Sequence, residues 1–103
     1  MRVISQDGTI DVPYECYTIW CYKDQYLDIY HIACDCGDEA YRRLAEYSTK
    51  AKAIKAMEML REKYLQYISL QGGESAFVQA VFQPNYWVLP KVFQFPQDNE
   101  IEV

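Results

Sequence analysis

Residues 48–73, STKAKAIKAMEMLREKYLQYISLQGG, are the stretch that decides the fold of this chain. Ala, Met, Leu, Lys and Glu dominate it, and neither proline nor glycine interrupts it before Gly72, so it predicts one long helix. Ser48 and Thr49 are suited to cap its first turn, and Gly72 and Gly73 to end it. Apolar side chains recur at steps of three and four and predict one buried face, formed by Ala53, Ile54, Met57, Leu60, Tyr64, Tyr67 and Ile68.

The residues that precede this helix carry strand patterns. Residues 1–5 and 9–12 flank the turn residues Gln6-Asp7-Gly8, which predicts a β-hairpin. Residues 14–22 (YECYTIWCY) and 26–33 (YLDIYHIA) are rich in aromatic and β-branched residues and predict a second hairpin. Two such hairpins provide the strands on which the helix can bury its apolar face.

The connections on either side of the helix are less regular. Residues 40–47 fit a strand, although a helical turn fits them too, and residues 74–83 fit either a strand or a short helix. Prolines at 84, 90 and 96 enclose NYWVLP and KVFQFP, two aromatic-rich segments of edge-strand length. The sequence therefore predicts a single α+β domain over residues 1–103, in which one long amphipathic helix packs on one face of an antiparallel β-sheet. Residues 97–103 form an acidic C-terminal tail that either frays or docks.

Composition limits the classes of function. With 103 residues, 50% of them hydrophobic, the chain fits one globular core. A net charge of -5 argues against binding to duplex nucleic acid, which needs a clustered basic surface. The aromatic content of 16%, with ten tyrosines, suits recognition surfaces as well as packing. Because no signal peptide or membrane-spanning run is seen, we expect a cytoplasmic protein without a membrane partner, and reduced cysteines.

The residues that usually carry catalysis or bind metals are sparse. Cys16, Cys21, Cys34 and Cys36 lack the pair spacing of a structural zinc site, and buried thiols are the simpler interpretation. His31 is the single histidine, and no nucleophile signature accompanies it, so a structural role with satisfied hydrogen bonds is expected. No glycine-rich phosphate loop occurs. The sequence therefore predicts no enzyme activity, no metal and no cofactor.

A binding surface is the remaining candidate. Five basic residues stand among aromatic ones, namely Arg42, Arg43, Arg61, Lys63 and Lys91. Arginine can hold phosphate oxygens in a bidentate manner, and an aromatic ring can stack on a base, so the mixture suits a nucleotide-like ligand. Composition by itself favours the simpler interpretation of a sheet core beneath solvated charges.

Three segments shift this balance: MRVISQDGTIDVPYE, EYSTKAKAIKAMEMLREKY and QPNYWVLPKVFQFPQDNEIEV. Together they resemble small phage and prophage proteins of Firmicutes that overlap the phage Thoeris anti-defence family, the sponge proteins that sequester cyclic ADP-ribose isomers. The resemblance implies a homodimer or higher homo-oligomer in the host cytoplasm that binds its signal at subunit interfaces without cleaving it. Because some members of the family bind cyclic oligonucleotides as well, these are implied as a second ligand class.

We chose candidate ligand-binding residues by chemistry and location. They are Arg61 and Tyr64 in the distal half of the helix, Asn85, Trp87 and Lys91 in the proline-bounded segment, and Arg42 as an outlying candidate. Aromatic rings would enclose adenine, basic side chains would hold the pyrophosphate, and asparagine would contact the base edge. Two other hypotheses stay open: an acidic phage protein that inhibits a host defence protein by direct binding, and a phage structural or assembly accessory.

Overall fold

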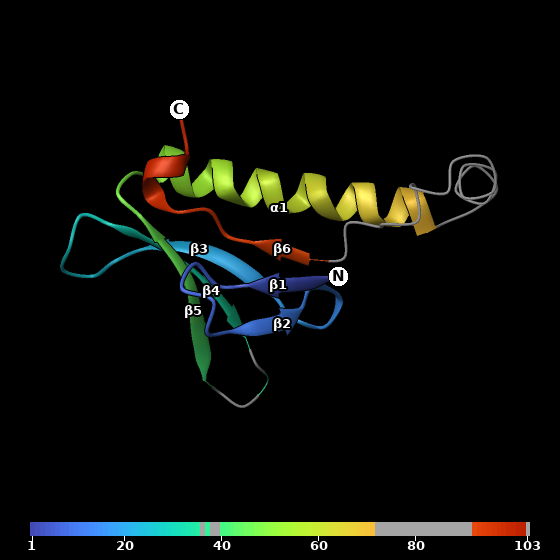
Figure 1. Cartoon of the computed structure of the whole chain (residues 1–103). Helices are drawn as coiled ribbons and strands as arrows, with labels where there is room; N and C mark the ends of the chain where they lie inside the picture. The colour runs from blue at the N-terminus through green and yellow to red at the C-terminus, as the bar shows by residue number, and fades with distance from the viewer. Residues whose placement is uncertain (36, 38–39, 72–91, 103) are drawn as a thin grey trace.

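A computed structural model describes residues 1–35, 37, 40–71 and 92–102 of the chain. It confirms the α+β class: six strands and one long helix fold together, with two short 3₁₀ turns, in the described residues (Figure 1). In chain order these are β1 (Arg2–Ile4), β2 (Asp11–Pro13), η1 (Tyr14–Cys16), β3 (Ile19–Lys23), β4 (Tyr30–Asp35), β5 (Tyr41–Tyr47), α1 (Lys50–Gln71), β6 (Val92–Gln94) and η3 (Asp98–Glu100). The residues predicted as NYWVLP, those at 74–83 and the two glycines after the helix lie outside the described part.

The strands form two three-stranded sheets, where the sequence predicted one antiparallel sheet. The first has the order β2-β1-β6, with Val3 opposite Val12 in the predicted antiparallel hairpin. Strand β6, from the predicted KVFQFP segment, occupies the edge and runs parallel to β1, with Phe93 beside Val3. A parallel pair needs a long crossover, which here contains the whole of α1. The first sheet is therefore mixed and joins the two ends of the chain.

The second sheet, β3-β4-β5, is an antiparallel meander, and residues 41–47 adopt the strand alternative. Its first hairpin is shorter than predicted. Residues 14–16 form the turn η1, so β3 begins only at Ile19. Strand β4 begins at Tyr30 because the Asp24 carboxylate accepts the backbone N–H groups of Tyr26 and Leu27, each at 2.9 Å, and folds these residues into a turn.

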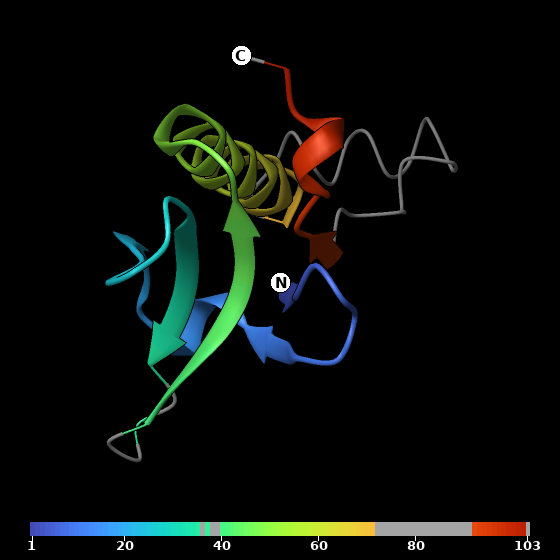
Figure 2. The same ribbon diagram turned by 90° about the vertical axis from the view of Figure 1, so that its left-hand side faces the viewer.

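Helix α1 lies over the strands of both sheets (Figures 1 and 2). Thr49 caps it as predicted, since its hydroxyl accepts the Lys52 N–H at 3.2 Å. The buried stripe, however, is Ala53, Ala56 and Leu60, while Ile54 is 43% exposed, contrary to prediction. Small alanines let the helix backbone approach the strands closely, which turns the larger Ile54 outward. Of the other predicted stripe residues, Met57 and Tyr64 are half-buried, and the side chains of residues 67 and 68 are outside the description.

The core lies between α1 and the two sheets. Its largest fully buried apolar side chains come from every layer, since Tyr47, Ile32 and Leu44 belong to the second sheet, Leu60 to α1, and Phe95 follows β6. Cys34 is a buried thiol in this core and Cys21 a half-buried one. Within the described residues, no helix combines the length and apolar character needed to cross a membrane.

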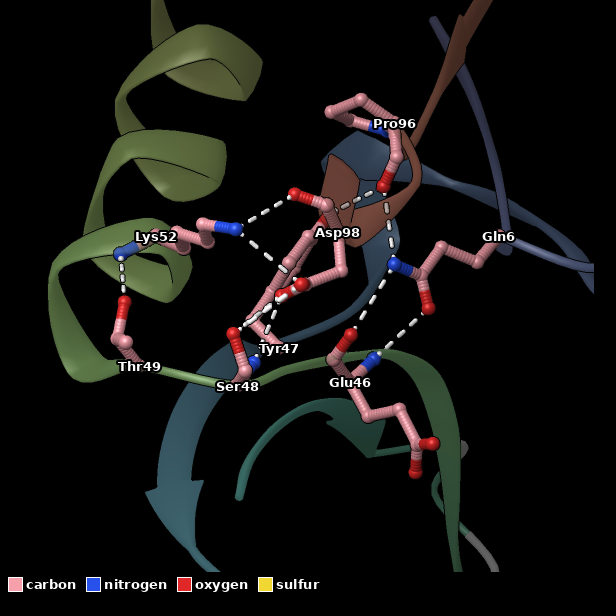
Figure 3. A network of polar contacts seen from close by, with 8 residues as sticks. All are labelled: Gln6, Glu46, Tyr47, Ser48, Thr49, Lys52, Pro96 and Asp98. Carbon is pink, nitrogen blue, oxygen red and sulfur yellow. Dashed lines mark hydrogen bonds and ion pairs between the residues drawn. The ribbon is translucent and has the colours of Figure 1, made fainter. Parts of the chain in front are cut away.

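A polar network fastens the two sheets and the C-terminal residues together (Figure 3). The Gln6 side chain pairs with the backbone of Glu46, accepting its N–H at 2.9 Å and donating to its C=O at 3.1 Å, and also donates to the Pro96 C=O at 2.9 Å. Asp98 accepts the Ser48 N–H at 2.7 Å and contacts the Lys52 ammonium at 3.2 Å. Residues 97–102 are thus docked beside the first turn of α1.

Candidate functional site

Strand alternation divides the β3-β4-β5 sheet into a core face and a second face, which we call the outer face. The pairing places Trp20 opposite Ala33, Tyr22 opposite His31 and Ala33 opposite Arg43. Opposite residues in neighbouring strands share a face, and so do residues two apart, which adds Tyr41. The outer face therefore includes Trp20, Tyr22, His31, Ala33, Tyr41 and Arg43, together with the acidic residues Asp35 and Glu46, which lie opposite Tyr41 and His31.

Aromatic rings run across this outer face. The ring centroids of Trp20 and Tyr41 are 6.0 Å apart, those of Tyr41 and Tyr22 are also 6.0 Å apart, and those of Tyr22 and His31 are 5.2 Å apart. Tyr41 is 48% exposed, while Trp20 and Tyr22 are half-buried. The small Ala33 leaves room for the larger rings over the central strand. The row therefore offers accessible π-surface fixed by its neighbours.

Arg43 supplies positive charge beside these rings. Its Nε donates a hydrogen bond to the Tyr22 hydroxyl at 3.0 Å, and its side chain is exposed. Burial raises the pKa of Tyr22, so this hydroxyl stays neutral and accepts the bond. The guanidinium also interacts with the Tyr41 hydroxyl, so Arg43 joins two rings of the row, and a guanidinium is the group that holds a phosphate in a bidentate manner.

His31 forms a pair with Asp24 at the edge of the aromatic row. The Nε2 atom of His31 lies 2.7 Å from one oxygen of the Asp24 carboxylate, and the other oxygen caps the β3–β4 turn. The hydrogen bond from His31, followed by those from the turn backbone, lowers the pKa of Asp24 well below its usual range. An ionised carboxylate only accepts hydrogen bonds, so Nε2 carries the proton.

The other ring nitrogen of His31 has no such partner. His31 is 2% exposed, and its Nδ1 atom is buried without a hydrogen bond. The nearest charged group to it is the Glu46 carboxylate, one oxygen of which lies 3.9 Å from Nδ1. The structure therefore differs from the predicted histidine with satisfied hydrogen bonds: one nitrogen is satisfied and the other is not.

A cavity of about 270 Å³ has His31 in its lining. Its volume is slightly below the range for small-molecule pockets, roughly 300–1,000 Å³. The cavity lies between the β1–β2 turn and strands β4 and β5, and its lining residues are Gln6, Asp7, His31, Arg43, Leu44, Ala45 and Glu46. Hydrogen bonds from the hydroxyls of Ser5 and Thr9 lower the pKa of Asp7 to about 2, so this carboxylate is ionised at neutral pH. The cavity is thus continuous with the outer face through His31 and Arg43.

Some of the residues selected from the sequence are placed elsewhere by the structure. Arg61 and Tyr64 lie on α1, where Arg61 is exposed and the Tyr64 ring packs on Tyr14 with centroids 4.4 Å apart. Arg42 is exposed near the start of β5, which is the end of that strand farther from α1 (Figure 2). These three residues are therefore not gathered at one place. Asn85, Trp87 and Lys91 lie outside the described residues.

A second hollow, of about 370 Å³, lies on the helix that carries Arg61 and Tyr64. It is lined by Met59, Glu62, Lys63, Gln66, Val92 and Phe93, from α1 and β6. Lys63 was among the basic residues that the sequence singled out. The hollow holds one cation and one carboxylate and no pair of aromatic rings in its described lining, so it suits stacking less well than the outer face.

The outer-face residues that were not among the predicted ligand-binding residues do carry a signal in the sequence. Tyr41 and Arg43 are two apart in a strand and so share a face, whereas Arg42 points to the opposite one. Trp20 and Tyr22 follow the same rule in β3.

Among the described residues, no group of three or more His, Cys, Asp or Glu side chains could hold a metal ion. Comparison of the chain with protein-family models, with curated protein sequences and with solved structures finds no match.

Proposed function

We propose that this protein binds a cyclic nucleotide signal on the outer face of the β3-β4-β5 sheet and sequesters it without cleaving it. The observation that supports this most directly is the row of rings from Trp20 through Tyr41 to Tyr22, with Arg43 attached to its end. A base has a π-face for stacking and a phosphate has oxygens for a guanidinium. The two groups of a nucleotide thus match the aromatic rings and the guanidinium of this face.

The expected magnitudes show how much each of the two contacts contributes to affinity. Stacking of a base on an aromatic side chain contributes about 1–3 kcal/mol. A charge-assisted hydrogen bond from arginine to phosphate is about twice as strong as a neutral one. One stacked base and one phosphate held by arginine together contribute about 2.5–6 kcal/mol, which corresponds to roughly two to four orders of magnitude in affinity.

Sequestration needs binding alone, so recovery of the unmodified ligand is the observation that separates it from catalysis. The resemblance to Thoeris anti-defence sponges supplies the ligand class to test first, the cyclic ADP-ribose isomers, with cyclic oligonucleotides second. A protein that holds such a signal would stop it from reaching a bacterial immune effector.

The experiment is a thermal-shift and recovery assay. Purified protein is incubated with cyclic ADP-ribose isomers or cyclic di-AMP, its Tm is measured, and the ligand released by heating is identified by chromatography. A ligand that binds only the folded state raises Tm by mass action. We expect an increase of several degrees and recovery of unmodified ligand.

A matched pair of variants locates the site. Tyr41→Ala removes the exposed central ring of the outer face, whereas Tyr26→Ala removes a tyrosine that is 86% exposed in the β3–β4 turn and is not part of the row of rings. Both variants should keep the Tm of the free protein, and only Tyr41→Ala should lose the ligand-induced shift. No shift with any nucleotide in the wild type, or cleaved ligand after heating, would contradict the proposal.

A further inference from the structure

We infer that the cavity beside the outer face is a subsite for the ribose hydroxyls of the bound nucleotide, with His31 Nδ1 and the Glu46 carboxylate as the acceptors. This inference rests on the proposed function and specifies which part of the ligand enters the cavity. Its basis is the buried Nδ1 atom, which has no hydrogen bond in the free protein and belongs to a residue that lines a hollow of about 270 Å³. A buried acceptor of this kind is costly unless a ligand completes it.

The hydrogen bond to Asp24 fixes the position of one imidazole proton. Asp24 is held by the backbone N–H groups of Tyr26 and Leu27 and takes the proton-bearing Nε2 at 2.7 Å. In a neutral imidazole the second nitrogen is then an acceptor. The Glu46 carboxylate oxygen, at 3.9 Å from Nδ1, is an acceptor too. Two acceptors cannot satisfy each other, and a hydroxyl group placed between them can donate to one or the other.

The other polar residues that line the cavity also offer few free hydrogen-bond donors. The amide donors of Gln6 are used by the carbonyl oxygens of Glu46 and Pro96, and its amide oxygen accepts the Glu46 N–H. Asp7 adds an ionised carboxylate. Arg43 is the one cation among the described lining residues, and it is bonded to Tyr22 on the outer face. A phosphate inside the cavity would meet negative charge, whereas vicinal hydroxyls would meet acceptors, as carboxylates bind ribose in dinucleotide sites.

The ligand is thereby oriented. Its ribose enters the cavity between the β1–β2 turn and β5, its base stacks on the neighbouring rings, and its phosphate stays outside near Arg43. The specificity that results is for a ribonucleotide over the corresponding deoxyribonucleotide, because only the former carries the hydroxyl that His31 accepts.

The first test uses the free protein. Nitrogen-15 NMR of the single histidine should show a neutral ring with the proton on Nε2 at pH 7.5. A proton on Nδ1, either in the other tautomer or in an imidazolium bonded to Glu46, would overturn the inference whatever the protein binds.

The second test compares two substitutions of His31. In His31→Gln the side-chain amide reaches the Nε2 position and can still donate to Asp24, but no acceptor remains at the Nδ1 position. In His31→Asn an oxygen can occupy the Nδ1 position while the contact with Asp24 is lost. With cyclic ADP-ribose as the probe in calorimetry, we expect His31→Gln to weaken binding about tenfold and His31→Asn to weaken it less.

The ligand itself provides a version of the test that needs no variant. The wild type should bind the 2′-deoxy analogue of cyclic ADP-ribose about tenfold more weakly than cyclic ADP-ribose. If the wild type binds both equally, or if His31→Gln binds as well as the wild type, the ribose subsite is wrong while the proposed function stands. If the wild type binds neither compound nor any other nucleotide, both are wrong.

Discussion

Replacing Gln6 by alanine should cost the protein a measurable part of its stability without removing any apolar core side chain. The Gln6 amide makes three hydrogen bonds, two to the backbone of Glu46 and one to the carbonyl oxygen of Pro96 (Figure 3). In this way the Gln6 side chain satisfies backbone groups at the edge of β5 and holds the start of the C-terminal segment. Each such bond contributes about 0.5–1.5 kcal/mol net. Because water can replace part of the exposed pairing with Glu46, we expect a loss of about 1.5–3 kcal/mol in the free energy of unfolding.

Urea unfolding followed by circular dichroism measures this loss, and the slope of the transition should stay unchanged. Gln25→Ala, at an exposed glutamine in the β3–β4 turn, is the matched control and should change the free energy of unfolding by less than about 0.5 kcal/mol. Gln6→Glu keeps the acceptor for the Glu46 N–H but places an oxygen against two carbonyl oxygens, and so should be no more stable than Gln6→Ala. Equal stability of Gln6→Ala and Gln25→Ala would refute the reasoning.

Three further predictions concern the fold. Leu60→Ala, at the buried face of α1, should destabilise the protein by about 2–5 kcal/mol in the same urea assay, because it leaves a cavity between helix and sheets. Asp98→Ala should speed hydrogen exchange of the Ser48 amide, whose N–H it accepts, and lower stability by about 1 kcal/mol, with Lys52→Ala giving a smaller loss. Asp7, with a pKa lowered from 3.8 to about 2, should contribute stability that is present above about pH 4 and is lost as the pH falls toward 2. Urea titrations of the wild type and Asp7→Asn across this range should converge at the acidic end, and a constant difference would contradict the assignment.

Local patterns were sufficient to predict several elements of the fold. The helix, its Thr49 cap and the first hairpin all depend on neighbouring residues, and each is present. The edge position of residues 92–94 followed from the flanking prolines. These features were predictable because propensity, capping and turn chemistry act over a few residues.

The sheet arrangement depends on contacts far apart in the chain. Nothing local indicates that β6 pairs with β1 in parallel, because that pairing joins residues about ninety positions apart. The irregularity in the pairing of β4 with β5, between Ile32 and Ala33, could not be predicted from the local sequence either. It places Arg43 beside Ala33 and Ala45 beside Ile32, and it makes Leu44 the extra residue.

The residue types of the candidate site were predictable from the sequence, but their positions in the fold were not. Arginine beside aromatic residues was recognised from composition, but the choice of residues on α1 and in the C-terminal segment ignored the two-residue period of β5. That period favours Arg43 over Arg42 as the neighbour of Tyr41. The role of His31 depends on Asp24, which lies across a turn whose length the strand pattern misjudged. A buried nitrogen without a partner is visible only in three dimensions.

The most direct test of the proposed binding face is a calorimetric comparison of Arg43→Ala with Arg42→Ala. The two substitutions remove the same side chain from adjacent positions of one strand, and so from opposite faces of the sheet. With a cyclic ADP-ribose isomer or cyclic di-AMP as ligand, Arg43→Ala should weaken binding at least about tenfold and by more than Arg42→Ala does. A larger loss in Arg42→Ala, or binding that is unchanged in Arg43→Ala, would contradict the outer face as the ligand site.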